Sequence, residues 1–314
     1  MEISILMSIY NETIEEVKKS INSILNQTFK DFELIIVIDN PELSFTNELI
    51  LSYDDERLLF LKNEKNIGLA LSMNKAAKIA KGKYIARMDA DDISNLNRLQ
   101  KEYEYLETHP EIGLVCSDYH YIDENDNIVD FEFVNINFNH YKKLLPYINM
   151  IHHPTVMMRK KIFDEIGGYR NFPCTQDYDL WLRLYYENIE FAKIEEDLLA
   201  YRMRKNSTWK SNGMKQQVIY FYIRKLFKER QKTATDSYSI ENLNAYLLKY
   251  NVTQTGIKSY TIGKEMILKA KKNLKNKELL KCLYNLIFGL MKSRFLRKEI
   301  KNKLLLYTVM RFEK

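Results

Sequence analysis

The chain has 314 residues, 46% of them hydrophobic, which is typical of a soluble globular protein with one large domain or two smaller ones. Its three cysteines, Cys116, Cys174 and Cys282, have neither zinc-site nor disulfide-framework spacing, so we expect a reducing, cytoplasmic compartment. The N-terminus lacks a basic region, and the longest nearly apolar run, 282–291, is shorter than the ~20 residues of a spanning helix. We therefore expect no signal peptide and no membrane span.

Charge is distributed unevenly along the chain. Residues 1–214 hold 25 Lys and Arg against 35 Asp and Glu, a net charge of −10, whereas residues 215–314 hold 23 against 7, a net of +16. Such an asymmetry indicates that the basic part faces an anionic partner, and a membrane surface and a nucleic acid are the two candidates. The alternative is a well-solvated tail in a lysine-rich protein.

The first 118 residues alternate between strand and helix patterns. Thr13 to Glu16 form a capping box at the start of an apolar helix face, and Gly82 is expected to end a later helix. The predicted elements are strands over 3–9, 33–38, 58–61, 84–88 and 114–118, and helices over 14–25 and 69–81. This order predicts an α/β fold with a doubly wound, mostly parallel sheet.

In such a sheet, ligands gather at the carboxyl ends of the strands. Asn11, Asp39 and Asp89 each follow one of these ends, so we expect them to share a cleft.

The pattern after residue 118 is mixed. A hairpin is expected over 121–133, turning at 124–127, and from about residue 215 the chain reads as almost wholly helical. Between them we expect helices near 139–149, 160–166 and 175–188 and strands near 153–158 and 191–202.

Three carboxylates, Asp89, Asp91 and Asp92, fall within four residues, shortly after Arg87. Like charges this close resist joint ionisation unless a cation lies among them, and carboxylate oxygens suit Mg²⁺ or Mn²⁺. The alternative is a solvated acidic turn that caps the helix near Asn95. The nine glycines form neither G-x-G-x-x-G nor G-x-x-x-x-G-K-[ST], so a phosphate here would be held by metal and side chains.

Seven short motifs then follow one another along the chain. They are Ser8-Ile9-Tyr10-Asn11-Glu12, Ile36-Val37-Ile38-Asp39, Asn66-Ile67-Gly68-Leu69-Ala70, Arg87-Met88-Asp89-Ala90-Asp91-Asp92, His153-Pro154-Thr155, Gly167-Gly168-Tyr169 and Gln176-Asp177-Tyr178-Asp179-Leu180-Trp181. In this order they resemble the family-2 glycosyltransferases, the inverting, metal-dependent GT-A enzymes that build bacterial capsule and lipopolysaccharide chains. The resemblance covers roughly residues 1–210. It implies a GT-A catalytic domain over 1–214, with a nucleotide-sugar half to about 118 and an acceptor half after it, followed by a basic helical region over 215–314.

The resemblance also implies a donor side. Asp39 matches the contact to uracil or ribose, although relatives usually read Asp-Asp-Gly-Ser where this chain has Asp39-Asn40-Pro41-Glu42. Asp91 matches the metal ligand. Asp89 matches the residue near the ribose and donor sugar, and it is a second candidate for binding the metal. Asp92 is expected to support both side chains. The nucleotide-sugar side chains implied are Ser8, Tyr10, Asn11, Glu12, Asp39, Asn66, Gly68, Arg87, Asp89 and Arg204.

Arg204 stands where relatives often carry a histidine near the metal. A guanidinium has no free lone pair for a metal, so the expectation is a diphosphate clamp and fewer protein ligands on the cation.

On the acceptor side, Asp177 matches the general base that takes the proton from an acceptor hydroxyl, while Asp179 is expected to cap or to pair with Arg183. Trp181 is expected to pack or to form a wall of the acceptor site, and His153 to be acceptor-side or structural. The acceptor-side residues implied are His153, Gly168, Tyr169, Gln176 and Trp181.

The expected enzyme moves a sugar from a nucleotide-diphosphate sugar, UDP-linked, to a saccharide acceptor carried on a polyprenyl diphosphate at the inner membrane face. A sugar nucleotidyltransferase is the nearest rival, but residues 4–12 lack its Gly-rich basic loop. The other class is a non-catalytic module whose basic helices bind nucleic acid or membrane; no nucleic-acid recognition motif is present, so no nucleic acid is expected.

The basic tail carries an apolar stripe at helical spacing: Leu279, Leu280, Leu283, Leu286, Ile287 and Leu290. With Lys275, Lys277, Lys281 and Lys292 nearby, it predicts a helix that lies on an anionic membrane surface. Packing on the catalytic domain, or across a homo-oligomer, is the alternative.

Overall fold

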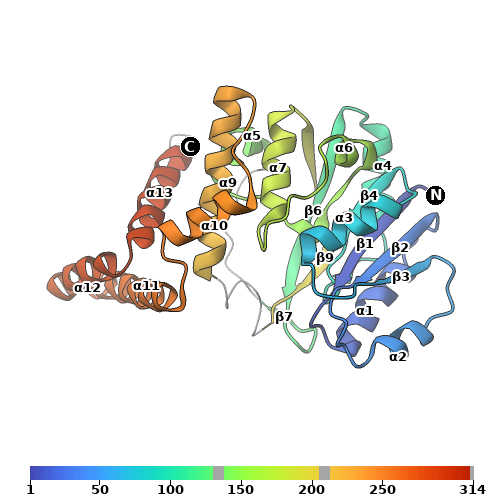
Figure 1. Ribbon diagram of the computed structural model, residues 1–314, viewed down its shortest axis with the longest axis horizontal. Coiled ribbons are helices and arrows are strands. Elements are labelled where there is room, and N and C mark those ends of the chain that lie inside the picture. Colours follow the sequence, from blue (N-terminus) through green and yellow to red (C-terminus); the bar gives the residue numbers. More distant parts are fainter. Residues whose placement is uncertain (130–137, 205–212, 312–314) are drawn as a thin grey trace. The chain divides into compact units, whose positions relative to one another are not determined.

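The computed structural model describes residues 1–129, 138–204 and 213–311, and the chain divides into two compact units, Met1–Ser207 and Thr208–Lys314 (Figure 1). The strands of the first unit are β1 (Ile3–Ile9), β2 (Phe32–Ile38), β3 (Leu58–Lys62), β4 (Tyr84–Arg87), β5 (Ile93–Ser94), β6 (Ile112–Ile122), β7 (Ile128–Val129), β8 (Met157–Arg159) and β9 (Glu190–Arg202). Its helices are α1 (Ile14–Leu25), α2 (Thr46–Leu51), α3 (Leu69–Ile79), α4 (Arg98–Thr108), η1 (Phe138–His140), α5 (Tyr141–Leu144), η2 (His153–Thr155), α6 (Lys160–Glu165) and α7 (Gln176–Tyr186).

The described strands form one sheet in the order β3-β2-β1-β4-β8-β6-β9-β5, with β7 paired to β6. From β3 to β4 all neighbours are parallel, and β8 is antiparallel to both β4 and β6. Ile9 of β1 is in register with Ile38 of β2. The parallel half therefore brings the carboxyl ends of β1, β2 and β4 to one edge, as the sequence predicted.

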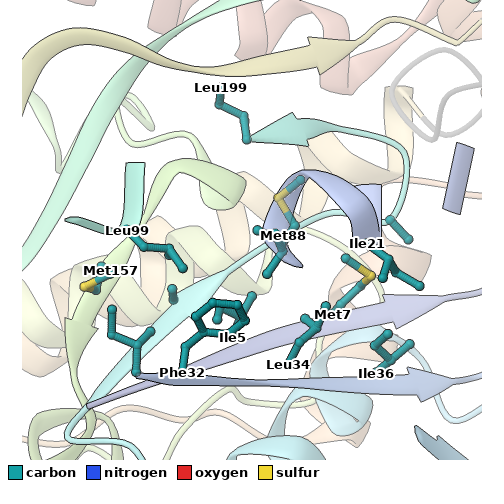
Figure 2. Close-up of a cluster of buried hydrophobic side chains, with 14 of the residues drawn as sticks. Ile5, Met7, Ile21, Phe32, Leu34, Ile36, Met88, Leu99, Met157 and Leu199 are labelled. Atoms are coloured by element: carbon teal, nitrogen blue, oxygen red, sulfur yellow. The ribbon is translucent and has the colours of Figure 1, made fainter. Parts of the chain in front are cut away.

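The core lies between this sheet and its helices. Every residue of β2 is buried, as expected for a parallel strand covered on both faces. Figure 2 shows one face of the core, where Ile5 and Met7 of β1 cluster with Leu34 of β2 and Ile21 of α1. On β1 and β2, α3 packs through small residues such as Ala76. Each large aliphatic side chain buried in this way contributes about 1.5–3 kcal/mol.

Several predicted elements agree closely with the structure. β1 and α1 have the predicted bounds, and Thr13 and Glu16 form both hydrogen bonds of the capping box. The hairpin turns at 123–127, where Asp123 accepts backbone hydrogen bonds from Asn125 and Asn127; its expected second strand beyond Val129 lies outside the described residues.

Two sequence predictions were wrong. Gly82 does not cap α3, which ends at Ile79 with an extended Ala80. Instead, a Cβ on Gly82 would lie 2.5 Å from the backbone nitrogen of Ser4, so the glycine permits a close approach to β1. The strand expected at 153–158 begins only at Met157, because His153–Thr155 forms the 3-10 turn η2 around Pro154, whose nitrogen cannot donate to a ladder.

The second unit is helical, as predicted. Its helices are α9 (Gly213–Thr233), α10 (Ile240–Lys249), α11 (Gln254–Lys275), α12 (Leu279–Lys292) and α13 (Arg294–Arg311). Lys298 of α13 donates to the hydroxyls of Tyr246 and Tyr250 at 2.8 and 3.0 Å, and its ammonium lies over both rings and over Phe221. Half-buried Lys298 thus links α13 to aromatic side chains of α9 and of the C-terminal end of α10.

Candidate active site

The carboxylate of Asp39, at the end of β2, organises the loop that leads into α3. Asp39 is 2% exposed, and its oxygens accept hydrogen bonds from the side chain of Asn63 and from the backbone nitrogens of Ile67 and Gly68, at 2.8–2.9 Å. Asn66 Oδ1 also accepts from the Gly68 nitrogen. These bonds leave little of the Asp39 carboxylate free, so its assigned contact to the nucleotide stays a prediction.

Gly68 has a positive φ of 86°, and no atom outside its chain neighbours lies within 4 Å of the position a Cβ would take. Glycine is therefore needed here for its backbone conformation rather than for space. The backbone it shapes is the open N-terminal end of α3, which begins at Leu69.

The acidic triplet after β4 divides into three environments. Asp89 is 29% exposed at its side chain and forms an ion pair with Arg87, which is 3% exposed and donates to the carbonyl of Leu6. Asp92 is fully buried and accepts a hydrogen bond from the Arg202 backbone nitrogen at 2.9 Å. Burial, with Asp91 and Asp89 nearby, raises the pKa of Asp92 well above its ordinary value, which favours its neutral form. Asp92 thus supports the loop by joining it to β9.

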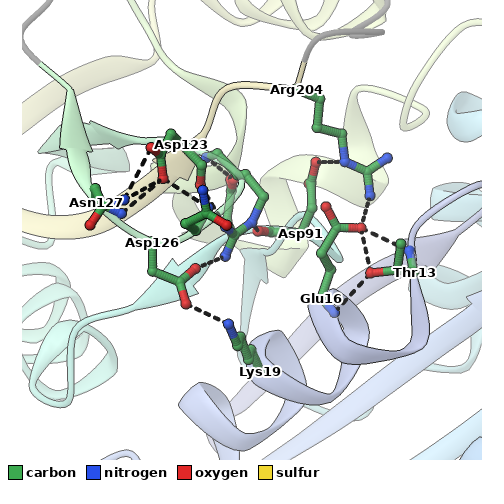
Figure 3. Close-up of polar contacts among 11 residues, drawn as sticks. Thr13, Glu16, Lys19, Asp91, Asp123, Asp126, Asn127 and Arg204 are labelled. Carbon is green, nitrogen blue, oxygen red and sulfur yellow. Dashed lines mark hydrogen bonds and ion pairs between the residues drawn. The ribbon is translucent and has the colours of Figure 1, made fainter.

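Asp91 lies opposite Arg204 in a cluster of side chains (Figure 3). Arg204 Nε lies 2.9 Å from Asp91 Oδ2, Nη2 donates to Glu16 at 2.6 Å, and Nη1 donates to Asn11 at 3.3 Å and lies 3.7 Å from Glu12. Burial and the Asp89 carboxylate raise the pKa of Asp91 to about 7, although the Arg204 charge acts in the opposite direction. One guanidinium therefore faces three carboxylates, from the loop after β1, from α1 and from the loop after β4.

The residues present fit a divalent cation that takes part of its shell from a ligand. Among the described residues, no three His, Cys, Asp or Glu side chains converge on a point where they could hold a metal. However, Asp89 Oδ2 and Asp91 Oδ1 accept no hydrogen bond from any of the described residues. Two hard oxygen ligands are what Mg²⁺ uses when phosphates and waters complete its coordination.

Asp177 lies in the first turn of α7, after Thr175, whose backbone is left-handed with a φ of 63°. Its Oδ2 accepts a hydrogen bond from Asn149 Nδ2 at 2.9 Å. Burial raises the pKa of Asp177 most, and Asp89 adds to the rise, while backbone hydrogen bonds and Asn149 oppose it. Asp177 therefore lies within electrostatic range of the acidic triplet, and its role as general base stays a prediction.

Asp179, two residues further on, points elsewhere and is structural. It is 1% exposed and pairs with Arg170 and with Arg183, the partner predicted from the sequence, whose Nε lies 2.9 Å away. Arg183 also donates to the backbone carbonyls of Ile166 and Gly168. The pair thereby fixes α7 to the glycine-containing loop at 166–170.

We expect Asp179→Asn to lower the free energy of unfolding by about 3–5 kcal/mol, because it removes the buried carboxylate that pairs with the buried Arg183 and the half-buried Arg170. Urea denaturation measures this change. The matched variant is Asp164→Asn, whose carboxylate forms an exposed ion pair with Lys160 and should change stability by only about 0–1 kcal/mol. Equal losses in the two variants would contradict the role given to Asp179.

The residues expected on the acceptor side form a packed group. His153 Nε2 and the Tyr169 hydroxyl are 2.8 Å apart, and burial holds the pKa of His153 well below its ordinary value, so the ring is neutral. Trp181 is 0% exposed, and its ring lies 6.1 Å from that of His153 at a steep angle, so it packs in the protein interior; a place in the acceptor site stays a prediction. Gly168 has a φ of 64°, and a Cβ there would lie 2.6 Å from Asn74 Oδ1.

Gln176, the first residue of α7, is only 6% exposed. Tyr10, by contrast, is 47% exposed, and Glu12 Oε2 accepts from its backbone nitrogen at 2.6 Å. Ser8 is half-buried on β1. The structure thus has most of the predicted donor-side residues at the ends of β1, β2 and β4, with Asn66 and Gly68 before α3 and Arg204 after β9. The predicted acceptor-side residues lie in η2, in the loop after α6 and in α7.

Sequence reasoning missed an aromatic cluster beside the acids. His152 stacks on Tyr119 of β6 with ring centroids 4.2 Å apart, and Tyr201 of β9 meets the same imidazole edge-on at 4.4 Å. Tyr121 pairs with Tyr201 across β6 and β9. Burial lowers the pKa of His152 to about 4, and Asp89 acts in the opposite direction, so this ring also lies near the triplet. The alternating tyrosines of 119–121 are the signal that could have revealed it.

A mostly parallel sheet with carboxylates gathered at the carboxyl ends of its strands, and a further carboxylate at the start of α7, is the arrangement of an α/β enzyme that binds its ligand at this edge. Residues 4–167, about half of the chain, match Glycosyl transferase family 2. The chain belongs to this family and is a glycosyltransferase.

Two relatives cover most of the chain. It is 40% identical over 233 residues to the uncharacterized glycosyltransferase MJ1057 of Methanocaldococcus jannaschii, covering 73% of this chain and 80% of that one. It is 35% identical over 236 residues to the O-antigen biosynthesis glycosyltransferase WbnJ of Escherichia coli, covering 74% and 91%.

Among solved structures, S. aureus TarS 1-349 in complex with UDP-GlcNAc superposes with a TM-score of 0.59 at 16% identity, covering 79% of this chain and 70% of that one. The likeness is one of fold, and it confirms the GT-A architecture that the sequence predicted.

Proposed function

We propose that this glycosyltransferase inverts the anomeric centre as it moves a sugar from a UDP-linked donor to a hydroxyl of a saccharide acceptor, in the synthesis of a bacterial surface polysaccharide. The observation that carries the proposal is Asp177, a half-buried carboxylate at the start of α7 that accepts a hydrogen bond from Asn149, has a raised pKa and lies close enough to Asp89 for their charges to interact. An inverting transfer needs one such base on the acceptor side and anion-binding groups on the donor side.

In the proposed reaction, Asp177 removes the proton from the acceptor hydroxyl. The hydroxyl oxygen forms a bond to the anomeric carbon while the bond from that carbon to the donor diphosphate breaks. The electron pair leaves with the nucleoside diphosphate, and the proton remains on Asp177. Asn149 holds the carboxylate in place through its 2.9 Å hydrogen bond.

Asp91 would hold the divalent cation, Mn²⁺ or Mg²⁺, with Asp89 as the second candidate ligand. When bound, the cation neutralises charge that develops on the leaving diphosphate. Arg204 lies beside the same carboxylate and carries the second positive charge of the site, so we assign it to the diphosphate as well.

We place the reaction at the inner face of the cell membrane, with an acceptor carried on a polyprenyl diphosphate. The relative in O-antigen biosynthesis supports an acceptor of the cell-surface type. In the described residues, no helix has the length and apolar character that crossing a bilayer requires.

A panel of sugar nucleotides tests the proposed reaction, with UDP-GlcNAc, the compound in the TarS structure, as a natural first donor. We expect one UDP-sugar to release UDP in the presence of Mn²⁺ or Mg²⁺ and much less after chelation. The product should have the anomeric configuration opposite to that of the donor, as read by NMR. Retention of configuration, or turnover that is indifferent to chelation, would overturn the corresponding part of the proposal.

A further inference from the structure

Helix α12 presents a row of large apolar side chains to solvent. Between 42% and 86% of each of these side chains is exposed, whereas Gly289 is the buried residue of the helix. The row, called the α12 stripe below, consists of Leu279, Leu280, Leu283, Tyr284, Ile287, Phe288 and Met291. Its spacing follows the helix repeat, so the seven residues form one continuous face about 18 Å long.

The packing of α12 on α11 fixes the direction of this face. A Cβ on Gly263 would lie 2.7 Å from the Gly289 carbonyl oxygen, and a Cβ on Gly289 would lie 2.9 Å from that of Gly263. The two backbones therefore cross in close contact through their glycines. This contact occupies one side of α12, and within the described residues the α12 stripe is left facing solvent on the other. Leu268 and Leu274 of α11 are also 60% and 57% exposed.

The charge around the stripe has one sign. Residues 254–292, which hold both helices, contain nine lysines and two glutamates. The lysines nearest the stripe, Lys271, Lys272, Lys275, Lys277, Lys281 and Lys292, are all exposed. An exposed apolar face within a strongly basic helix pair is the pattern of a segment that lies in the interface of an anionic bilayer.

We propose that the α11–α12 pair docks on an anionic lipid surface, with the α12 stripe at the acyl boundary and the surrounding lysines on the headgroup phosphates. A second copy of the chain would bring two basic pairs together, and a nucleic acid would contact lysines but leave the stripe exposed. The purpose of this docking rests on the proposed function, because docking would hold the enzyme beside a lipid-linked acceptor. Binding to vesicles can nevertheless be measured without catalysis.

The test is co-sedimentation of the full chain with vesicles of phosphatidylcholine alone and of equal parts phosphatidylcholine and phosphatidylglycerol. We expect binding to the anionic vesicles that weakens at high salt. The double variant Leu280→Glu, Leu283→Glu should bind them at least about tenfold more weakly, because it removes two apolar side chains from the acyl boundary and adds two negative charges. The matched control is Leu51→Glu: Leu51 of α2 is 85% exposed, against 86% for Leu280, and should leave vesicle binding unchanged.

A second variant, Lys271→Gln with Lys275→Gln, keeps the stripe and should also weaken binding to the anionic vesicles. Circular dichroism and release of UDP from the donor with a soluble acceptor, measured on the same samples, separate loss of docking from loss of folding or of the proposed reaction. The proposal is overturned if the wild-type chain does not bind anionic vesicles. It is also overturned if the double variant Leu280→Glu, Leu283→Glu binds them as tightly as the wild type does. A wild-type dimer in light scattering that this variant converts to monomer overturns it as well, since the stripe would then belong to a second copy.

Discussion

Replacing Asp177 by asparagine is expected to lower the turnover of sugar transfer by about 10²–10⁴-fold, the contribution of a positioned general base. Asparagine keeps the size of the side chain, and its carbonyl oxygen can still accept the hydrogen bond from Asn149, so the start of α7 should keep its shape. What is lost is the group that takes the acceptor proton. UDP release at saturating substrates measures the effect, and calorimetry with donor alone should show unchanged affinity.

Asp164→Asn is the matched control, because it makes the same chemical change on an exposed carboxylate of α6. Its turnover should equal that of the wild type. If both variants retained most of the wild-type turnover, another group would have to accept the proton, and the assignment of Asp177 would be wrong.

The pH dependence gives an independent reading of the same residue. A base acts when deprotonated, and burial raises the pKa of Asp177, so turnover should rise with pH through a range above that of an ordinary aspartate, ~3.9. The Asn149 hydrogen bond stabilises the charged form and opposes this rise. Asn149→Ala should therefore displace the acid limb of the turnover profile to still higher pH, whereas a residue of merely structural importance would lower turnover equally at every pH.

The parallel half of the fold could be predicted from the sequence because its signals are local. The local sequence patterns of residues 3–9 and 14–25 predict a buried strand and a capped helix, and both elements have the predicted bounds. The errors arose where a contact distant in sequence decides. Gly82 looks like a helix cap, yet its role is set by Ser4, 78 residues away, whose side chain accepts its backbone hydrogen bond.

The same distinction applies to the site. Motif order placed Asp91 and Asp177 at strand and helix ends, where the structure has them. Glu16 was interpreted only as part of a capping box, but it also accepts a hydrogen bond from Arg204, which is 188 residues away. No pattern within α1 or around Arg204 encodes that contact, since it exists only once β9 has joined the sheet.

Asp91→Asn is expected to abolish binding of Mn²⁺ to the enzyme and to lower kcat/KM by about 10²–10³-fold, which corresponds to the several kcal/mol that a catalytic cation supplies. Electron paramagnetic resonance of Mn²⁺ measures the binding without any turnover. The difficulty is that Asp91 would have two roles: one oxygen is assigned to the cation, and the other lies 2.9 Å from Nε of Arg204. A loss of binding could therefore follow from a displaced Arg204.

Glu16→Gln separates the two roles, because Glu16 also pairs with Arg204, at 2.6 Å, but is not assigned to the cation. The variant loosens Arg204 but can keep the capping box, because a glutamine at this position also accepts a hydrogen bond from the Thr13 nitrogen. A melting curve checks that stability is retained. We expect the variant to retain Mn²⁺ binding while donor affinity falls, since the guanidinium assigned to the diphosphate is less well held. If Glu16→Gln and Asp91→Asn lost Mn²⁺ equally, placement of Arg204 would control the cation, and Asp91 would not be its ligand.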